Sequence, residues 1–477
     1  MNKLNFWDVD WGSDDGKDDS NLSKYFFFIP DYLNIKNGEK RYIIGRKGSG
    51  KSAILERIKI DSESNSFASV NNLSLKDFPL SLIRSLRDKS YKDKSQYVPI
   101  WSYLILLALA NKIVDDQSAK PSDKILELID FLKINNFFGK TIVENISTIE
   151  KNDSKVIVSG NLLSCDSGSE DSLSTNRTIH FQAFYLDLLN ILSGLGSDVT
   201  YYLLFDELDE GWHAGDENHK LLLLALFRSI ENIYKSFEKS GIIFRPVLAL
   251  RSDIFELLED SDLNKLDDYI LKLEWTTEST NGYDLSKLIN KRIVSSFGES
   301  TLDPWNSIVE NYDRALPHAV NSLWKYMLNR TYERPRDIIK YLKYCKKLAA
   351  IGKLYFHHVA KAEIGYSNWL YCEIRDEINT YLPVWKESLQ CLTKIGKGKF
   401  EYSLLEEYLN LDTTISKYLK EKKISAYDIA CQMFNLSIIG NAINGKWYFK
   451  YKDHIIPFDS TKDIIVHYGL KNKLRMF

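Results

Sequence analysis

The glycine-rich segment at residues 41–52 constrains this chain more than any other. It reads RYIIGRKGSGKS, an apolar stretch followed by a loop of the form GxxxxGKS, and residues 53–58 then favour a helix. Strand, glycine loop and helix in this order form the Walker A arrangement. Glycines let the backbone bend so that consecutive N–H groups face a phosphate, and the start of the following helix adds its positive end. The segment therefore predicts a P-loop that binds a nucleoside triphosphate.

The residues of this loop have predicted roles. Lys51 is expected to reach the terminal phosphates of ATP, and the Ser52 hydroxyl is expected to bind Mg²⁺. The alternative is a glycine-rich turn that matches the pattern by chance, and the flanking strand and helix argue against it. The predicted cradle for the nucleotide consists of Gly45, Arg46, Lys47, Gly48, Ser49, Gly50, Lys51 and Ser52.

A second acidic motif follows the most apolar strand of the chain. Residues 200–205 read TYYLLF and run directly into Asp206 and Glu207, which is a Walker B pattern. We expect this strand beside the P-loop strand, with Asp206 holding Mg²⁺ through its water shell. Glu207 is then expected to orient or deprotonate the attacking water. A buried strand that simply ends in two solvated carboxylates is the alternative, and Asp209 and Glu210 are interpreted as charged loop residues.

Arginines downstream are candidate sensors of the γ-phosphate. Some ATPases place a further strand between the P-loop and Walker B strands, and its tip carries a polar sensor; residues 246–250 end in Arg251 at such a position. A guanidinium suits phosphate because it donates several hydrogen bonds in one plane. A simple ion pair of Arg251 with Asp253 is the alternative.

Two further arginines open a helix. Arg334 and Arg336 flank Pro335 in its first turn, and Arg336 is slightly preferred as the residue that senses the γ-phosphate. Helix capping or a salt bridge between domains is an equally good interpretation. Arg228, on the helix after Walker B, is a weaker candidate for an arginine finger that serves a neighbouring subunit.

The pattern of elements predicts an α/β fold. Helices and continuously apolar strands alternate up to about residue 280, as a parallel sheet covered on both faces requires. We therefore expect a P-loop NTPase core of the ASCE or AAA+ type at residues 1–280, with residues 141–175 inserted as a hairpin and a Ser/Gly/Asp-rich loop. Residues 281–395 are predicted to be a helical lid domain.

Residues 396–477 predict a small winged-helix-like domain. Helices are expected at 403–410, 414–420 and 425–436, followed by a strand, a turn at residues 444–446 and a strand at 447–451. Residues 411–477 hold 11 Lys and Arg against 6 Asp and Glu. Lysines on a winged helix can contact nucleic-acid phosphates. A protein-docking or autoinhibitory domain with a solvated basic face is the alternative.

Composition places the chain among globular proteins. It holds 63 basic and 65 acidic side chains, so its net charge favours neither nucleic acid nor membrane as a partner. Its N-terminus lacks the long apolar core of a signal peptide, and residues 98–110, its longest apolar stretch, are too short to span a bilayer and predict a buried helix. Five scattered cysteines without a CxxC pair predict free thiols. We expect a cytoplasmic protein without a membrane partner.

With these motifs assembled, the chain resembles a family of bacterial P-loop ATPases known as FunZ-like, within the broader AAA+/STAND class. The resemblance rests on the loop GRKGSGKS, on LRSDIF at residues 250–255, on RPRDII at 334–339 and on IIVHYGL at 464–470. It implies a nucleotide domain, a lid and a winged helix. It also implies a setting in mobile-element and antiphage defence gene clusters.

Three functions fit this sequence. The first is an ATP-driven switch or scaffold that self-assembles and controls a separate effector protein encoded nearby, such as a nuclease. The second is a DNA-acting ATPase of the origin-recognition or loader type, which grips duplex DNA through the winged helix. The third is a nearly inert structural subunit that binds nucleotide. No second catalytic group is evident in the sequence, which favours the first.

Overall fold

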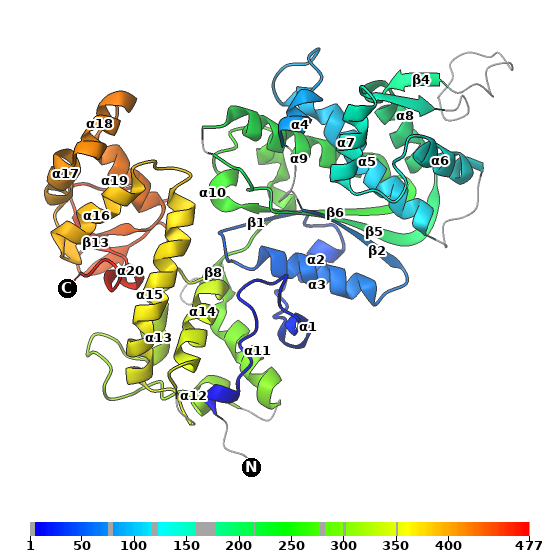
Figure 1. Ribbon diagram of the computed structural model, residues 1–477. Coiled ribbons are helices and arrows are strands. Elements are labelled where there is room, and N and C mark those ends of the chain that lie inside the picture. Colours follow the sequence, from blue (N-terminus) through cyan, green and yellow to red (C-terminus); the bar gives the residue numbers. More distant parts are fainter. Residues whose placement is uncertain are drawn as a thin grey trace. The chain divides into compact units, whose positions relative to one another are not determined.

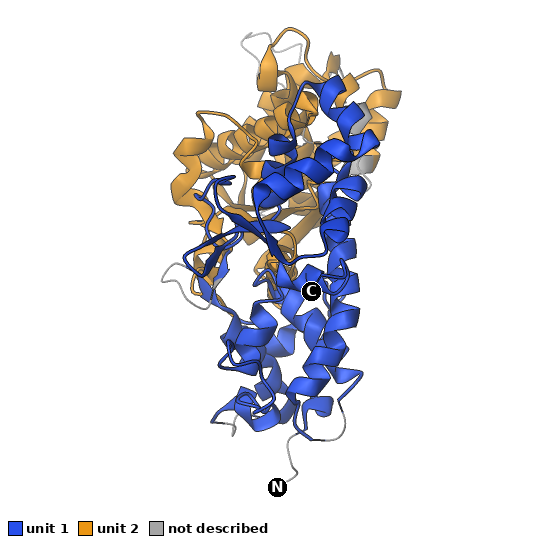
Figure 2. Cartoon of the chain, turned by 90° about the vertical axis from the view of Figure 1, so that its left-hand side faces the viewer, with its two compact units in different colours: residues 1–27, 274–477 blue, residues 28–273 orange. Residues whose placement is uncertain are grey.

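A computed structural model describes residues 5–74, 80–116, 123–158, 177–213, 215–276, 282–298, 302–349 and 352–476. The chain divides into two compact units. One unit holds residues 28–273, and the other holds residues 1–27 together with residues 274–477 (Figure 2). This division begins the second unit at residue 274 rather than 281, and it groups the N-terminal segment with the C-terminal half. The predicted separation of lid from winged helix stays a prediction.

The unit of residues 28–273 is built on a five-stranded sheet. Its strands follow the order β2 (Ala68–Ser74), β5 (Gly196–Asp206), β6 (Gly241–Arg251), β1 (Tyr42–Gly45) and β7 (Ile270–Lys272). Every neighbouring pair is parallel. The predicted α/β fold with a parallel sheet is therefore confirmed. The expectation that β5 lies beside β1 is wrong, because β6 pairs with both and separates them.

Helices cover both faces of this sheet, which explains why its central strands carry continuous apolar runs, YYLLF in β5 and PVLAL in β6. All four residues of β1 are buried, and so are the last six of β5. On one face lie α2 (Tyr32–Lys36) and α3 (Lys51–Glu63), and α5 (Val98–Asp115), α8 (Phe181–Ser193) and α9 (Glu217–Phe237) lie on the other (Figure 1). The same unit also contains α4 (Leu80–Ser85), α6 (Asp123–Ile134), α10 (Ser252–Phe255) and the 3-10 turns η2 (Asp93–Tyr97) and η5 (Leu263–Tyr269).

The longest apolar segment is a core helix. α5 buries Trp101 and the run from Tyr103 to Leu107 completely. Together with the preceding turn, residues 93–115 are the one helix of the described residues that is long and apolar enough to cross a membrane. Most of this segment is buried inside the unit, and burial against α8 and α9 accounts for its composition. The predicted buried helix is confirmed, although it is longer than the sequence indicated.

The predicted insertion at residues 141–175 is only partly a hairpin. Residues 142–151 form a helix, α7 (Ile142–Lys151), so this part of the prediction is wrong. The reason is a capping box, in which Thr141 and Glu144 satisfy each other's backbone N–H groups. β3 (Lys155–Val158) then pairs antiparallel with β4 (Arg177–His180). The Ser/Gly/Asp-rich tract between these strands lies outside the described residues.

A buried arginine links the sheet to α9. The guanidinium of Arg41 donates from Nε and Nη2 to the two carboxylate oxygens of Glu231, each at 3.1 Å, and the Tyr42 hydroxyl donates to the same carboxylate at 2.8 Å. The rings of Tyr234 and Tyr269 lie about the guanidinium, with centroids at 4.0 and 3.8 Å. This network fixes α9 against the start of β1, the strand that leads into the glycine loop.

The second unit is helical and then sheet-containing. It begins with η1 (Phe6–Asp8) and α1 (Leu22–Tyr25). This N-terminal segment is anchored by Phe6, Val9 and Trp11, which are buried in the core of the unit. A short parallel pair, β8 (Trp275–Thr276) and β9 (Tyr283–Asp284), precedes the helices. These are α11 (Leu285–Phe297), α12 (Pro304–Ile308), α13 (Leu323–Leu328), α14 (Pro335–Lys346), α15 (Phe356–Ile378) and α16 (Trp385–Ile395). The cysteines Cys345, Cys372, Cys391 and Cys431 are unpaired, and Cys165 lies outside the described residues.

The last 80 residues contain the predicted helices and hairpin. The helices are α17 (Tyr402–Leu411), α18 (Thr413–Lys422) and α19 (Ala426–Asn435), and β11 (Ile439–Ile443) pairs with β12 (Lys446–Tyr448). Asn444 and Gly445 both have positive φ, 50° and 76°, as a tight two-residue hairpin turn requires. Two strands were not predicted: β10 (Lys399–Phe400) and β13 (Asp463–Val466) complete a four-stranded sheet of order β10-β13-β11-β12.

The start of α14 is tied to this sheet. The ring of His467, which precedes α20 (Tyr468–Lys471), stacks on Tyr332 at 4.3 Å, and its Nε2 lies 3.2 Å from the carbonyl oxygen of Thr331. The Tyr332 hydroxyl donates to the carbonyl of Ser437 at 3.3 Å. The segment at 464–470 therefore contacts the residues that lead directly into the segment at 334–339.

We expect Glu231→Gln to lower the free energy of unfolding by about 3 kcal/mol, because it leaves the buried charge of Arg41 without its carboxylate. Denaturant unfolding of the full chain would measure this change. Glu217→Gln is the matched control on the same helix, since Glu217 is largely exposed and its ion pair is with the neighbouring Lys220. The control should cost less than about 1 kcal/mol. Equal losses in the two variants would contradict a structural role for the Arg41 network.

Candidate nucleotide-binding site

The carboxyl ends of three adjacent strands bring the predicted site residues to one edge of the sheet. Gly45 ends β1 and stands in register with Arg251, which ends β6. Asp206 ends β5 on the other side of β6 and stands in register with Ser74, the last residue of β2. In parallel sheets ligands bind at this edge. The motifs at residues 45–52, 206–207 and 251, which are far apart in the sequence, are thus neighbours.

Backbone geometry explains the glycines of the loop. Gly48 and Gly50 have φ values of 78° and 102°, in a region that side chains disfavour. At Gly45 a Cβ atom would lie 2.7 Å from the Ser49 hydroxyl and 2.9 Å from the carbonyl oxygen of Leu273, so no side chain fits there. α3 begins at Lys51, directly after the loop, and its N-terminal turn faces this edge of the sheet.

Lys51 lies folded over the loop. Its Nζ donates to the carbonyl oxygens of Gly45 at 2.8 Å and Arg46 at 3.0 Å. Burial lowers the pKa of Lys51 to about 8, and the carboxylates of Asp209 and Asp206 oppose that effect while Arg251 adds to it. These three residues therefore lie close enough to Lys51 to act on its charge. A bound phosphate would favour the ammonium form further.

The acidic pair after β5 has an unusual backbone. Asp206 is 4% exposed, and its Oδ1 accepts the backbone N–H of Glu207 at 2.9 Å. Glu207 itself has φ of +57°, which is costly for a residue with a side chain and is concentrated at functional sites. Its carboxylate accepts a hydrogen bond from the hydroxyl of Ser74. Ser74 is a site residue that the sequence analysis missed, because only strand pairing reveals that β2 ends beside β5.

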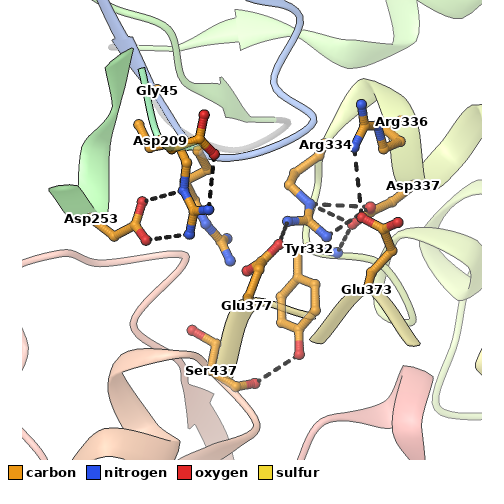
Figure 3. Close-up of polar contacts among 12 residues, drawn as sticks. Gly45, Asp209, Asp253, Tyr332, Arg334, Arg336, Asp337, Glu373, Glu377 and Ser437 are labelled. Atoms are coloured by element: carbon orange, nitrogen blue, oxygen red, sulfur yellow. Dashed lines mark hydrogen bonds and ion pairs between the residues drawn. The ribbon is translucent and has the colours of Figure 1, made fainter. Parts of the chain in front are cut away.

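Arg251 is held by two carboxylates. Its Nε and Nη2 donate to the oxygens of Asp253 at 3.0 and 2.6 Å, and its Nη1 donates to Asp209 at 3.2 Å (Figure 3). The predicted position between the loop strand and the acidic strand is correct. The pairing with Asp253, which was the alternative interpretation, is also present, and a sensor role stays a prediction. Asp209 proves to be a partner of Arg251 rather than a simple loop charge.

The downstream arginines have partners within their own unit. Arg334 is 3% exposed and bonds to Asp337 at 3.0 Å and to Glu377 at 3.1 Å. Burial opposes its charge, but the carboxylates of Asp337 and Glu377 outweigh that effect and raise the pKa of Arg334. Its observed contacts are therefore those of a buried salt bridge.

Arg336 is held more loosely than Arg334. It lies 3.6 Å from Glu373 (Figure 3). It also lies 3.7 Å from Asp15, and its Nε donates to the carbonyl oxygen of Asp14 at 3.2 Å. Two of these three contacts are longer than an ordinary hydrogen bond. Arg228, the candidate finger, bonds to the Ser95 hydroxyl at 3.1 Å on an exposed surface. The predicted sensor and finger roles of these arginines stay predictions.

The donor set at this edge fits Mg²⁺ with phosphate. Mg²⁺ takes oxygen ligands and is bound by one or two protein groups together with phosphate oxygens and water. The Ser52 hydroxyl in the first turn of α3 and the buried Asp206 carboxylate are ligands of this kind. No group of three or more His, Cys, Asp or Glu side chains within the described ranges is arranged to hold a metal by itself.

These observations define an α/β protein with a five-stranded parallel sheet and a glycine loop, two carboxylates and an arginine at the carboxyl edge. Residues 283–375 match the model of the FunZ-associated C-terminal helical domain, which spans β9 to most of α15. The match covers about a fifth of the chain and includes residues 334–339, which carried part of the resemblance. It supports a FunZ-like protein. No curated protein matches the chain.

The geometry of the loop predicts a specific cost for one substitution. Gly50→Ala should lower the free energy of unfolding by about 1–2 kcal/mol, because φ is +102° although a Cβ atom has open space around it. Gly196→Ala is the matched control: a Cβ atom at Gly196 is equally unobstructed and its φ is not positive, so it should be neutral or slightly stabilising. Thermal unfolding of both variants would measure the difference, and equal stability of the two would argue against the strained loop.

Proposed function

We propose that this protein is an ATPase that acts as a molecular switch or scaffold and controls a separate effector protein. The observation that carries the proposal is the meeting of the glycine loop, Arg251 and the Asp206–Glu207 pair at one edge of the parallel sheet. In this proposal residues 45–52 hold the phosphates of ATP, and Ser52 and Asp206 hold Mg²⁺. Mg²⁺ would neutralise charge that develops on the phosphates during their transfer to water.

The proposed hydrolysis assigns a task to each side chain. Lys51, which now donates to two loop carbonyls, would turn its ammonium group to the terminal phosphates. The carboxylate of Glu207 would hold the attacking water and accept its proton. Ser74 would orient Glu207 through its hydroxyl. Arg251 would donate to the γ-phosphate in place of one of its carboxylate partners.

The proposed effector and the biological setting rest on the family match and the resemblance, not on the geometry of the site. The helical domain matched at residues 283–375 supports a FunZ-like protein, and the resemblance adds antiphage defence in bacteria as the biological setting. In this proposal ATP promotes self-assembly into a homo-oligomer that licenses an effector encoded nearby, such as a nuclease. Purification of the tagged chain together with its neighbouring gene products, with and without ATP, would test this part.

Two substitutions test the ATPase directly. Lys51→Ala should weaken ATP binding by about 2–4 kcal/mol, because the phosphates lose a partly buried cation. Glu207→Gln should bind ATP normally and hydrolyse it about 10²- to 10⁴-fold more slowly, because the amide cannot accept the proton. Calorimetric titration and phosphate release would measure the two effects. Undiminished affinity in the first variant, or unchanged turnover in the second, would contradict the assigned roles.

A second candidate function is a DNA-binding ATPase of the origin-recognition or loader type. The observation that favours it is the order β10, α17, α18, α19, β11, β12 and β13, with three helices before an antiparallel sheet, which is the order of a winged helix. Lys446 at the start of β12 is exposed. Lys420, Lys422 and Lys423, at the end of α18, lie before the helix that would enter a groove.

The two candidates differ in their response to DNA. If DNA is a ligand, Lys446→Gln together with Lys450→Gln should abolish DNA-stimulated hydrolysis and reduce the salt dependence of binding by about two phosphate contacts. Lys239→Gln combined with Lys265→Gln, at exposed positions of the other unit, is the charge-matched control. ATP-dependent oligomerisation with no effect of DNA on turnover would instead favour the effector switch.

A further inference from the structure

Asp209 bonds to Arg251, one of the two cations of the candidate site, although no motif includes it. Its Oδ2 accepts from Nη1 of Arg251 at 3.2 Å. Lys51 Nζ donates to the carbonyl oxygen of Gly45, which stands in register with Arg251, so the two cations belong to neighbouring strand ends. The Asp209 side chain is 34% exposed, whereas that of Arg251 is 12% exposed. A partly solvated anion therefore pairs with a largely buried cation, Arg251.

Repulsion between Lys51 and Arg251 at this edge of the sheet explains why an anionic residue is needed there. Lys51 and Arg251 must both be positive when they meet a phosphate, and two cations at neighbouring strand ends repel each other. An anion that contacts Arg251 and lies near Lys51 offsets that repulsion. A terminal phosphate would supply the same anionic charge and would accept the same planar N–H donors.

We propose that Asp209 is a positioning residue, an exchangeable counter-ion that holds Arg251 and stabilises Lys51 until a terminal phosphate of ATP takes its place. The inference rests on the proposed ATPase function and adds a residue to it. Asp209 holds the two cations ready at the edge of the sheet. On binding, the phosphate displaces the carboxylate from Arg251, and the carboxylate turns to solvent.

The contacts distinguish Asp209 from Asp253, the other carboxylate at Arg251. Asp253 lies two residues after Arg251 in the chain and forms two hydrogen bonds with its guanidinium, at 3.0 and 2.6 Å. Asp209 belongs to the turn after β5 and forms one bond of 3.2 Å. The two carboxylates are about equally exposed, at 34% and 33%, but a single longer bond exchanges at lower cost than a bidentate pair. Asp253 therefore keeps Arg251 oriented while Asp209 leaves.

Asp209 lies in the same turn as Glu207, so its release from Arg251 would affect Glu207. It follows Glu207 by two residues in a turn in which Glu210 N–H bonds to the Glu207 carbonyl at 3.4 Å and Trp212 N–H bonds to the Asp209 carbonyl at 3.1 Å. Release of Asp209 from Arg251 would loosen the turn that holds Glu207 at φ of +57°. Occupancy of the phosphate site is thereby coupled to the residue proposed to activate water.

Asp209→Asn tests the proposal in the full chain with MgATP. The variant lacks the competing charge but keeps the size of the side chain, so KM and the Kd for ATP should fall about three- to tenfold. kcat should fall as well, because Arg251 and the turn lose their coupling. Asp209→Glu should restore both values toward those of the wild type. Asp209→Ser is a second neutral variant, so that a folding defect in one does not decide the result.

Glu210→Gln is the matched control, since it removes the same charge from the neighbouring exposed residue. It should change KM and Kd less than about twofold. If the Asn and Ser variants bind ATP as the control does, or more weakly than the wild type, Asp209 is not a counter-ion that phosphate displaces. Failure of the proposed function looks different: the wild type would then not bind ATP, and Lys51→Ala would make no difference.

Discussion

The pairing of β6 with both β1 and β5 is the constraint on which the candidate site depends. A glycine loop, an arginine and an acidic pair that are separated by about 200 residues become neighbours only because three parallel strands end at the same edge. The pairing needs helices on both faces of the sheet, and the Arg41–Glu231 network fixes one of them, α9, to the start of the loop strand. Core packing and site geometry therefore have one origin.

The sequence predicted those features that depend on local chemistry. The loop at residues 45–52 was found because phosphate binding needs glycines at positions of positive φ, and Gly48 and Gly50 hold such positions. The apolar strand before Asp206 and the buried helix after residue 97 were found because burial on both sides leaves a continuous apolar run. The hairpin prediction is wrong at residues 142–151 for a local reason as well. β-Branched residues there favour a strand, but the capping box at Thr141 starts a helix.

Features that depend on tertiary pairing could not be predicted from one sequence. Nothing in residues 68–74 indicates that Ser74 ends opposite Asp206, and β10 and β13 are too short to be recognised without their partners. The same limit applies to the role of charges. Asp209 reads as a solvated loop residue, and only the bond to Arg251 shows that its carboxylate belongs to the site.

The arginines show how burial and partner geometry separate roles that sequence leaves equal. Arg334 and Arg336 stand two residues apart in the same motif, yet Arg334 is enclosed by Asp337 and Glu377, and Tyr332 N–H shares the Asp337 carboxylate at 2.9 Å. Removing Arg334 would leave buried carboxylates without a cation, so loss of function there would report loss of structure. Among the residues that the structure describes, Arg336 has two long ion contacts and one carbonyl partner. Of the two, Arg336 alone could exchange its partners for an anion without disturbing the core.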